Sequence, residues 1–279
     1  MDQLVEIKSK IQINPSRVGK KYFVKTFGCQ MNEHDSERIS GMFELDGMSK
    51  AISEEYADVL FVNTCTIREN ADDKLYGTLG QLKQWKSQKD NRKLLVGGCA
   101  AQKDKELVRE KAPWVDVVIG THNLTNVVDL LNRSEDWGPL TEIIDEIETL
   151  PTEAPSIRES EYSAWVTIQI GCNNSCTFCI VPSVRGQEIS RRPSDIVNEA
   201  KKLVDEGVKE ITLLGQNVNS YGRDLKIEGK ARPYFSQLLE QLNDIKGLER
   251  IRFTSPHPKD FKAETIESCL LYTSPSPRD

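Results

Sequence analysis

The sequence lacks any long apolar run, because no stretch of about 18 or more residues in its 279-residue length is apolar. A membrane-spanning helix of the usual length is therefore excluded at this stage. The N-terminal segment also lacks an apolar signal core, so the sequence favours a cytoplasmic protein. Histidine is scarce, and its three residues lie far apart in the chain: His34, His122 and His257.

Neither sign of charge dominates the composition, since the net charge is −6 with 29% charged and 38% hydrophobic residues. These proportions are typical of a globular protein, and the length allows two domains. The acidic excess is local, because residues 134–161 hold nine acidic residues and one basic residue, a net of −8. The rest of the chain therefore carries +2, and charge neither supports nor excludes an RNA partner.

After a lead-in at residues 1–19 without a strong pattern, short apolar segments alternate with helical ones through residues 20–132. The expected strands are 22–27, 58–63, 93–96 and 115–119. The expected helices are 32–45, with Asn32 as its N-cap, and 68–85, 103–111 and 124–131. Buried strands that alternate with helices predict an α/β fold with a parallel, doubly wound sheet.

Residues 133–163 break this pattern, because they are acidic and contain several prolines, and we interpret them as a linker with one short element near 140–147. A second βα pattern follows over residues 164–268. Its expected strands are 165–170, 210–214 and 250–254. Its expected helices are 194–206, capped by Ser194, then 233–245, opened by Pro233, and 261–268. Three βα units make half of a barrel.

Residues 269–279 do not continue the pattern where a fourth strand is expected, and they end in Ser-Pro-Ser-Pro-Arg-Asp. We interpret this segment as foreign sequence joined to a shortened chain, which should be left out of fold reasoning. The alternative is a disordered natural C-terminus.

Three of the seven cysteines recur at intervals of about one βα unit, and Cys29, Cys65 and Cys99 each follow an expected strand. Ligands of an open parallel sheet bind beyond the carboxyl ends of its strands, and successive strands are often neighbours. We therefore expect the three cysteines, here called the first triad, to converge on one crevice. Adjacent glycines would let the backbone approach a bulky cofactor: Gly28, Gly97 and Gly98. The alternative is three buried core cysteines.

A second triad, Cys172, Cys176 and Cys179, has the spacing C-x-x-x-C-x-x-C within QIGCNNSCTFCIVP. Three thiolates this close suit a cuboidal iron–sulfur cluster with one iron left open to a small molecule. In a chain without a signal peptide, such cysteines favour metal binding over disulfides. The alternative is a zinc site with three cysteines and one histidine, but every histidine is remote in sequence.

These triads and their flanks give the chain a resemblance to the radical S-adenosylmethionine (SAM) methylthiotransferase family over about residues 20–268. The segments KTFGCQMNEHDSERI (Lys25–Ile39) and LLGQNVNSYG (Leu213–Gly222) are most similar to its tRNA-modifying, MiaB-type branch. The resemblance implies a flavodoxin-like domain followed by a partial radical SAM (β/α) barrel. It also implies that the second triad binds a 4Fe–4S cluster that holds SAM, and that the first triad binds an auxiliary 4Fe–4S cluster.

Other residues carry weaker hypotheses. Phe178, between two cysteines, would line the site of the SAM adenine or pack beside the cluster. The resemblance places the SAM amino group after the second barrel strand, where this chain has Gly215, Gln216 and Asn217 instead of the usual Gly-Gly-Glu. Three arginines after the cysteine loop would meet RNA phosphates or lie on a solvated loop: Arg185, Arg191 and Arg192. His257, which follows the third barrel strand, is either functional or structural.

The implied reaction adds a methylthio group to carbon 2 of isopentenyl-adenosine beside the tRNA anticodon. The implied partners are that tRNA and an electron donor such as flavodoxin or ferredoxin, with no membrane partner and a monomeric chain. The alternatives are a methylthiotransferase acting on threonylcarbamoyl-adenosine or on a ribosomal protein, and a non-catalytic iron–sulfur carrier. The resemblance further implies three more barrel units and a C-terminal TRAM domain, so we expect this chain alone to be inactive on tRNA.

Overall fold

The computed structural model describes residues 13–66, 71–146, 155–227, 230–231 and 233–270. These residues form two compact units. The first unit takes residues 13–146, 155–157 and 174–186, and the second takes residues 158–173 and 187–270. Each unit has a parallel sheet and an apolar core of its own.

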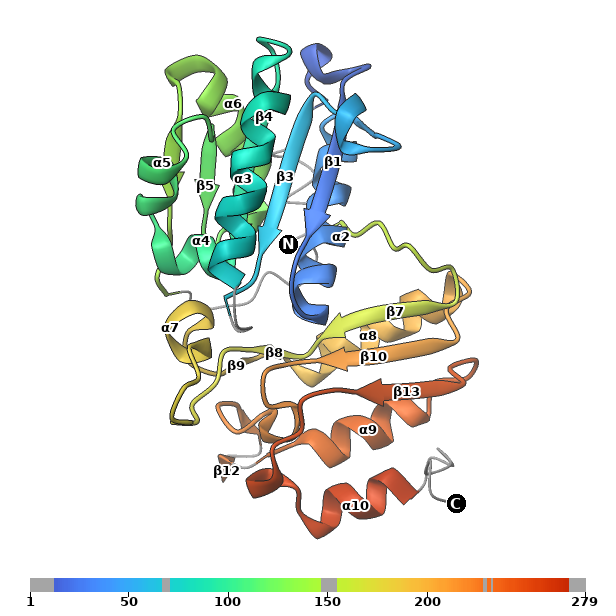
Figure 1. Ribbon diagram of the computed structural model, residues 1–279. Helices are drawn as coiled ribbons and strands as arrows, with labels where there is room; N and C mark the ends of the chain where they lie inside the picture. Colours follow the sequence, from blue (N-terminus) through green and yellow to red (C-terminus); the bar gives the residue numbers. More distant parts are fainter. Residues whose placement is uncertain (1–12, 67–70, 147–154, 228–229, 232, 271–279) are drawn as a thin grey trace. The chain divides into compact units, whose positions relative to one another are not determined.

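The sheet of the first unit has six strands in the order β2-β1-β3-β4-β5-β6, and every neighbouring pair is parallel (Figure 1). Its strands are β1 (Lys21–Thr26), β2 (Ser49–Lys50), β3 (Val59–Thr64), β4 (Lys93–Gly98), β5 (Val117–Ile119) and β6 (Leu140–Glu142). This is the flavodoxin-like strand order with one more strand at the edge, and its switch point lies between β1 and β3. The predicted flavodoxin-like, doubly wound domain is confirmed.

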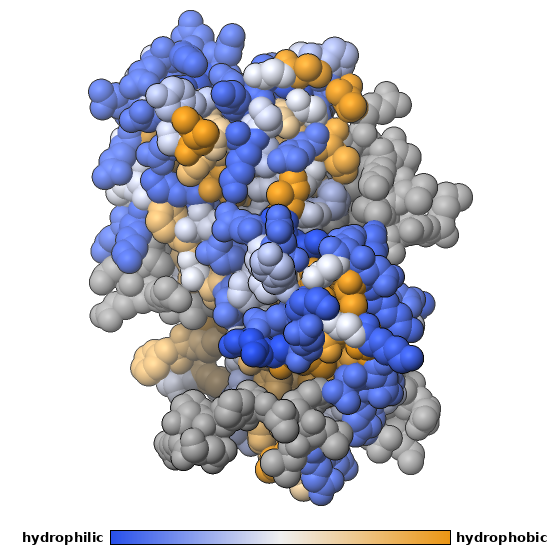
Figure 2. All heavy atoms as spheres, turned by 90° about the vertical axis from the view of Figure 1, so that its right-hand side faces the viewer, coloured by the Kyte–Doolittle hydropathy of each residue, from blue (hydrophilic) through white to orange (hydrophobic). Residues whose placement is uncertain are grey.

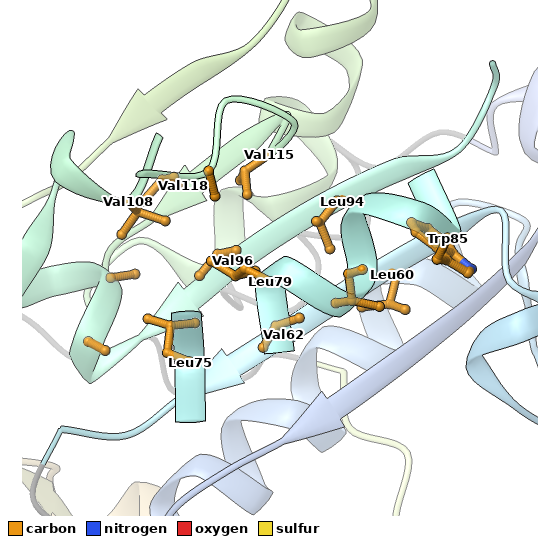
Figure 3. Packing of buried hydrophobic residues seen from close by; sticks show 14 of the residues in the cluster. Leu60, Val62, Leu75, Leu79, Trp85, Leu94, Val96, Val108, Val115 and Val118 are labelled. Carbon is orange, nitrogen blue, oxygen red and sulfur yellow. The ribbon is translucent and has the colours of Figure 1, made fainter. Parts of the chain in front are cut away.

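Helices cover both faces of this sheet. The side chains of each strand alternate between the faces, so an almost continuously apolar strand presents apolar side chains on both of them. The helices are α2 (Gln30–Leu45), α3 (Ala71–Ser87), α4 (Cys99–Asp104), α5 (Leu107–Lys111) and α6 (Val127–Trp137), with short 3₁₀ turns η1 (Pro15–Arg17), η2 (Glu54–Tyr56) and η3 (Leu124–Asn126). Leu60 and Val62 of β3 pack in a cluster with α3, as Figure 3 shows. Val59 and Phe61 of the same strand pack with α2 and α6 on the opposite face. The strand is therefore buried on both sides.

Several predicted boundaries in this unit are wrong. Residues 133–137, assigned to the linker because of their acidic composition, form the end of α6. The short element expected near 140–147 is confirmed as the strand β6, which pairs with β5. The helix expected at 103–111 is two helices, since Lys105 between them has a φ of 50°. Helix α2 begins at Gln30, so Asn32 lies inside the helix and is not its N-cap. Residues 147–154 of the predicted linker lie outside the described residues.

The second unit contains a three-stranded parallel sheet in the order β13-β10-β7. Its strands are β7 (Ser163–Thr167), β10 (Glu210–Leu214) and β13 (Arg250–Phe253), and its helices are α8 (Pro193–Asp205), α9 (Phe235–Asn243) and α10 (Ala263–Leu270). Smaller elements are β8 (Gln169–Ile170), which pairs antiparallel with β9 (Ile189–Ser190), β11 (Lys226–Ile227), which pairs antiparallel with β12 (Lys230–Ala231), and the turns η4 (Val218–Ser220) and η5 (Pro258–Asp260). Three βα units in chain order confirm the predicted partial barrel.

Local details of the second unit differ from the predictions. The strand expected at 165–170 is two strands, because residues 169–170 leave β7 to pair with β9. Helix α8 has Arg192 at its N-cap and Pro193 in its first turn, so Ser194 is not the cap. Helix α9 begins only at Phe235, so Pro233 precedes the helix rather than opening it. Residues 271–279 of the predicted tail lie outside the described residues.

The last strand of the partial barrel is less covered than the others. Along β13, Arg250 and Arg252 are exposed, whereas Ile251 and Phe253 are half-buried against the core of the second unit. Figure 2 shows one face of the molecule, on which hydrophilic residues predominate and smaller apolar groups lie between them. None of the helices in the described segments is both long and apolar enough to cross a membrane.

The predicted lead-in is anchored from residue 13 onward by a buried arginine. Arg17 of η1 is fully buried. Its Nε lies 3.2 Å from Asp46 Oδ2, and its Nη1 lies 2.6 Å from Glu135 Oε1. A buried guanidinium is stable only when its charge is paired, which explains both carboxylates. Residues 1–12 lie outside the described residues.

We predict that Asp46 makes the stability of the first unit depend on pH. Burial raises the pKa of Asp46 from 3.8 to about 6, although the Arg17 charge opposes this shift. Because the folded pKa is raised, the contribution of Asp46 to stability is fully present below pH 3.8 and is lost as the pH rises through about 6. Between pH 4 and 7 the wild-type chain should lose about 2–3 kcal/mol of unfolding free energy relative to Asp46→Asn. Urea unfolding at several pH values in this range measures the unfolding free energy of both proteins. The prediction is contradicted if the difference between the two free energies does not change with pH.

Candidate functional site

The first triad lies at the carboxyl ends of three neighbouring strands. Cys29 follows β1 and occupies the N-cap position of α2, Cys65 directly follows β3, and Cys99 is the first residue of α4 after β4. Because β1, β3 and β4 are adjacent and parallel, their carboxyl ends meet at one edge of the sheet. Cys65 and Cys99 are buried, and Cys29 is half-buried. The three thiols are close enough for the charges of Cys29 and Cys65 to raise the pKa of Cys99, whose burial raises it most.

Asn32 holds the backbone around this triad in place. Its Nδ2 donates to Thr64 O at 2.8 Å and to Phe27 O at 3.2 Å, which ties α2 to the ends of β3 and β1. Its Oδ1 accepts from Cys29 Sγ at 3.4 Å. Asn63 completes the link, because its Nδ2 donates to Asn32 O at 2.8 Å.

Sequence reasoning missed both asparagines as parts of the site. The signal that could have found Asn63 is its place as a polar residue at the end of an otherwise apolar strand. The signal for Asn32 was misassigned to a helix cap.

The glycines beside the triad are required by packing within the protein. A Cβ at Gly28 would lie 2.8 Å from Cys65 Cβ, and one at Gly97 would lie 2.4 Å from Phe61 Cζ. A Cβ at Gly98 would lie 2.5 Å from both Thr64 O and Asn63 Oδ1. Protein atoms therefore occupy the place of each missing Cβ, and the approach of this backbone to a cofactor stays a prediction.

Arg185, the last residue of α7 (Val181–Arg185), faces the first triad within the first unit. Its Nη2 donates to Asp35 Oδ2 at 2.9 Å and to Asn32 Oδ1 at 3.2 Å, and its side chain is only 4% exposed. Burial alone would lower the pKa of Arg185, but the charges of Cys99, Asp35 and Cys29 raise it overall. The prediction that Arg185 meets RNA phosphates is wrong, because the side chain is buried and paired.

The other two arginines of that hypothesis differ from each other. Arg191 is buried in the second unit, where its Nη2 lies 2.6 Å from Glu199 Oε2 and its Nη1 donates to Thr167 O at 2.8 Å. Arg191 is therefore structural. Arg192 is exposed, so it alone of the three can reach a solvent-borne partner.

The second triad is divided between the two units. Cys172 is buried in the second unit and follows Gly171, whose φ is 73°. Cys176 and Cys179 are exposed, and the backbone N–H of Cys179 donates to Cys176 O at 3.1 Å in a tight turn. Phe178 in that turn is 99% exposed. Among the described residues, no three His, Cys, Asp or Glu side chains form a group that could hold a metal ion.

Three buried amide oxygens near the end of β10 lack a donor among the described residues: Gln216 Oε1 and Asn217 Oδ1, which follow β10, and Gln169 Oε1 of β8. Asn217 is fixed by two contacts, since its Nδ2 donates to Asp260 Oδ2 at 2.8 Å and its carbonyl accepts from Gln169 Nε2 at 2.6 Å. Burial alone would raise the pKa of Asp260, but hydrogen bonds from Arg223 and Asn217 hold it below its ordinary range. Acceptors without donors suit a ligand that brings N–H groups, such as an ammonium.

His257 is structural in this arrangement. Its Nδ1 accepts from the backbone N–H of Lys259 at 3.2 Å and so caps η5. Its backbone N–H and carbonyl both bond the side chain of Asn219 at 2.8 Å. Of the two alternatives for this histidine, the structure favours the structural one.

The donor types of the first triad are those that an iron–sulfur cluster takes, although its side chains, all among the described residues, are not gathered into a metal-holding group in this structure. Three thiols at one sheet edge supply the soft ligands that such clusters take, and a fixed guanidinium offsets their negative charge. Asn32 and Asn63 hold the strand ends that carry the thiols, as outer residues of a metal site do.

Comparison with known proteins matches both halves of the chain. Residues 21–120 match the Uncharacterized protein family UPF0004, and residues 166–270 match the Radical SAM superfamily. A tRNA-2-methylthio-N(6)-dimethylallyladenosine synthase of Corynebacterium efficiens is 53% identical over 89% of this chain and 48% of its own length. The protein of that name from Tropheryma whipplei is 55% identical over 88% of this chain and 52% of its own length. The chain spans about half the length of the curated relatives it matches.

Solved structures share the fold at low sequence identity. The radical SAM methyltransferase TsrM from Kitasatospora setae aligns with a TM-score of 0.54 and 10% identity, over 90% of this chain and 57% of its own. The cobalamin-dependent SAM radical enzyme OxsB aligns with a TM-score of 0.55 and 13% identity, over 90% of this chain and 41% of its own. The two family matches and the relatives of more than 50% identity agree: the chain joins a UPF0004 region to a Radical SAM region and is similar to tRNA-2-methylthio-N(6)-dimethylallyladenosine synthases over about half of their length.

Proposed function

We propose that this chain is part of an enzyme that adds a methylthio group to carbon 2 of isopentenyl-adenosine next to the anticodon of tRNA. The observation that carries the proposal is the convergence of Cys29, Cys65 and Cys99 at the ends of three adjacent strands, in a chain that also holds the radical SAM cysteine motif. The relatives named above carry that activity in their names, and they match both halves of the chain.

We propose that the first triad holds an auxiliary 4Fe–4S cluster and that Cys172, Cys176 and Cys179 hold a second one. When bound, such clusters supply one-electron chemistry with SAM and a sulfur-binding iron, which acid–base groups of the protein cannot supply. The chain's own part is to fix the ligands. Asn32 and Asn63 hold the strand ends of the first triad, and the Cys176–Cys179 turn presents two thiols to solvent, where they can receive iron.

The segment Gly215, Gln216 and Asn217 is the proposed binding site of the SAM amino group. An ammonium carries several N–H donors, and the amide oxygens of Gln169, Gln216 and Asn217 are acceptors without a donor among the described residues. Amide acceptors replace the carboxylate of the usual Gly-Gly-Glu motif, so the ammonium would be held without a full counter-charge. Phe178, which is almost fully exposed, is free to cover the adenine when SAM binds.

The further elements of the proposal rest on the relatives and on the sequence. The partners are the isopentenyl-adenosine tRNA and a flavodoxin- or ferredoxin-type electron donor, and the chain acts as a monomer in the cytoplasm. The domain of the auxiliary cluster begins near residue 20, and the radical SAM domain spans residues 164–268. The rival substrates are threonylcarbamoyl-adenosine in tRNA and a ribosomal protein.

Nucleoside mass spectrometry of tRNA tests this function. Cells that lack the gene for this chain should lose the 2-methylthio form of isopentenyl-adenosine and accumulate the unmodified isopentenyl form. Reintroducing a gene for the whole enzyme should restore it, and reintroducing that gene with Cys176→Ala should not. Loss of 2-methylthio-threonylcarbamoyl-adenosine instead would assign the rival nucleoside substrate. Unchanged tRNA modification would contradict a tRNA-modifying function.

A further inference from the structure

Arg185 belongs by sequence to the loop of the second triad but lies by structure against the first. It follows Cys179 by one short turn and the helix α7. Within the first unit its guanidinium contacts Asp35 and Asn32 of α2, and it is close enough to Cys99 to interact through a hydrogen bond and its charge. A cation this deeply buried costs several kcal/mol to desolvate, so its place beside three thiols requires a compensating role.

The position of Arg185 is fixed from several sides. Helix α7 packs against α4, the helix that begins at Cys99. The carbonyl of Val184 accepts from Thr121 Oγ1 at 2.7 Å, and the backbone N–H of Thr121 donates to Gln102 Oε1 on α4 at 2.9 Å. Helix α4 therefore positions the thiol of Cys99 directly, and it positions the Arg185 guanidinium on α7 through Thr121.

Among the described residues, Arg185 is the cation on which the charges of Cys99 and Cys29 act. Its partner Asp35 neutralises one positive charge, while the cysteines would contribute up to three negative charges when they ligate a metal. His122 lies near Arg185 but adds no charge, because burial and the Arg185 charge both lower the pKa of this histidine. In a buried site of low dielectric, removing one fixed charge is not compensated by solvent.

We propose that Arg185 is a positioning residue of the auxiliary cluster site, whose fixed positive charge raises the reduction potential of the cluster and slows its loss. The inference rests on the proposed cluster at the first triad. A nearby positive charge stabilises the more negative, reduced form of a cluster, and both net charge and hydrogen bonds to sulfur set cluster potentials. Helix α7 begins two residues after Cys179 and ends at Arg185. The contacts of Arg185 therefore also tie the segment that carries Cys176 and Cys179 to the first triad, within the first unit.

Potentiometric titration followed by electron paramagnetic resonance tests the proposal. The measurement uses the reconstituted full chain with Cys176→Ala, so that the remaining signal belongs to the auxiliary cluster. Arg185→Met should raise the ratio of oxidised to reduced cluster at least tenfold at a fixed potential, a downward shift of 59 mV for one electron. Arg185→Lys should stay close to the parent, and the exposed Arg192→Met is the matched control without effect. Iron release to a chelator should become several-fold faster in Arg185→Met.

A variant of opposite sign separates an electrostatic role from a merely structural one. Asp35→Asn keeps Arg185 but removes its counter-charge, so the potential should rise. A structural role predicts weaker cluster retention in both variants without opposite shifts. An unchanged potential in Arg185→Met that still holds its cluster overturns the proposal. A parent chain that binds no iron at the first triad overturns the proposed cluster itself, which is a different result.

Discussion

Replacing Cys99 with alanine is expected to halve the iron that the chain binds after anaerobic reconstitution, from about eight to about four atoms per chain. Cys99 is fully buried at the start of α4, between the charges of Cys29, Cys65 and Arg185. Two remaining thiols hold a cluster poorly, because each lost thiolate removes a covalent bond to iron and leaves that iron open to solvent. The second triad does not share this ligand and should keep its iron.

Iron, acid-labile sulfide and zinc per chain are the quantities to measure. Cys176→Ala should also leave about four irons, and the double variant should leave about none. Cys269→Ala is the matched control, since this seventh cysteine lies in α10 and belongs to neither triad. Eight irons in Cys99→Ala would show that Cys99 is not a ligand. Zinc in place of iron in the parent chain would contradict the iron–sulfur hypothesis altogether.

The convergence of the first triad could be predicted because it follows from the sheet and not from side-chain detail. The apolar segment at 58–63 predicted a buried strand, and β3 is buried along its whole length. Each cysteine follows the end of its strand within three residues, so adjacency of the strands was the one further requirement. The edge strand β2 could not be predicted, because Ser49 and Lys50 are two exposed polar residues without an apolar pattern.

The buried arginines could not be predicted, since a charge in a sequence is most often solvated. Arg185 is buried because the thiol of Cys99 and the carboxylate of Asp35, 150 residues away in the chain, supply opposite charge. Arg191 is buried because Glu199 on α8 and the carbonyl of Thr167 receive its N–H groups. Partners on other helices and strands are set by tertiary structure, which no local pattern encodes.

Acidic composition misled the domain boundary for a related reason. The residues 134–142 contain Glu135, Asp136 and Glu142, and two of these are structural, since Glu135 pairs with Arg17 and Glu142 with Arg133. Burial raises the pKa of Glu142, but the hydrogen bond from Arg133 lowers it overall below its ordinary range. Composition counts these charges as solvent-facing, whereas the structure uses them to fix α6 and β6.

A second substitution, Gly98→Ala, is expected to destabilise the first unit by about 3 kcal/mol or more and to prevent the auxiliary cluster from forming. Gly98 has φ 91° and ψ −165°, a backbone region that only glycine adopts without strain. The added Cβ would also lie 2.5 Å from Thr64 O and from Asn63 Oδ1. Thr64 O is backbone and Asn63 is held in the network of Asn32, so neither atom can move away cheaply.

Gly77→Ala is the matched control, because this residue lies in α3 with nothing within 4 Å of an added Cβ. An exposed helical glycine loses conformational freedom on folding, so the alanine should raise the unfolding free energy by up to about 1 kcal/mol. Urea unfolding of the metal-free chain measures both substitutions, and iron per chain measures the site. Opposite signs are expected because the two glycines differ in backbone conformation and in what surrounds them. Wild-type stability with full iron in Gly98→Ala would mean that the end of β4 relaxes freely, and the first triad would then not be a preformed site.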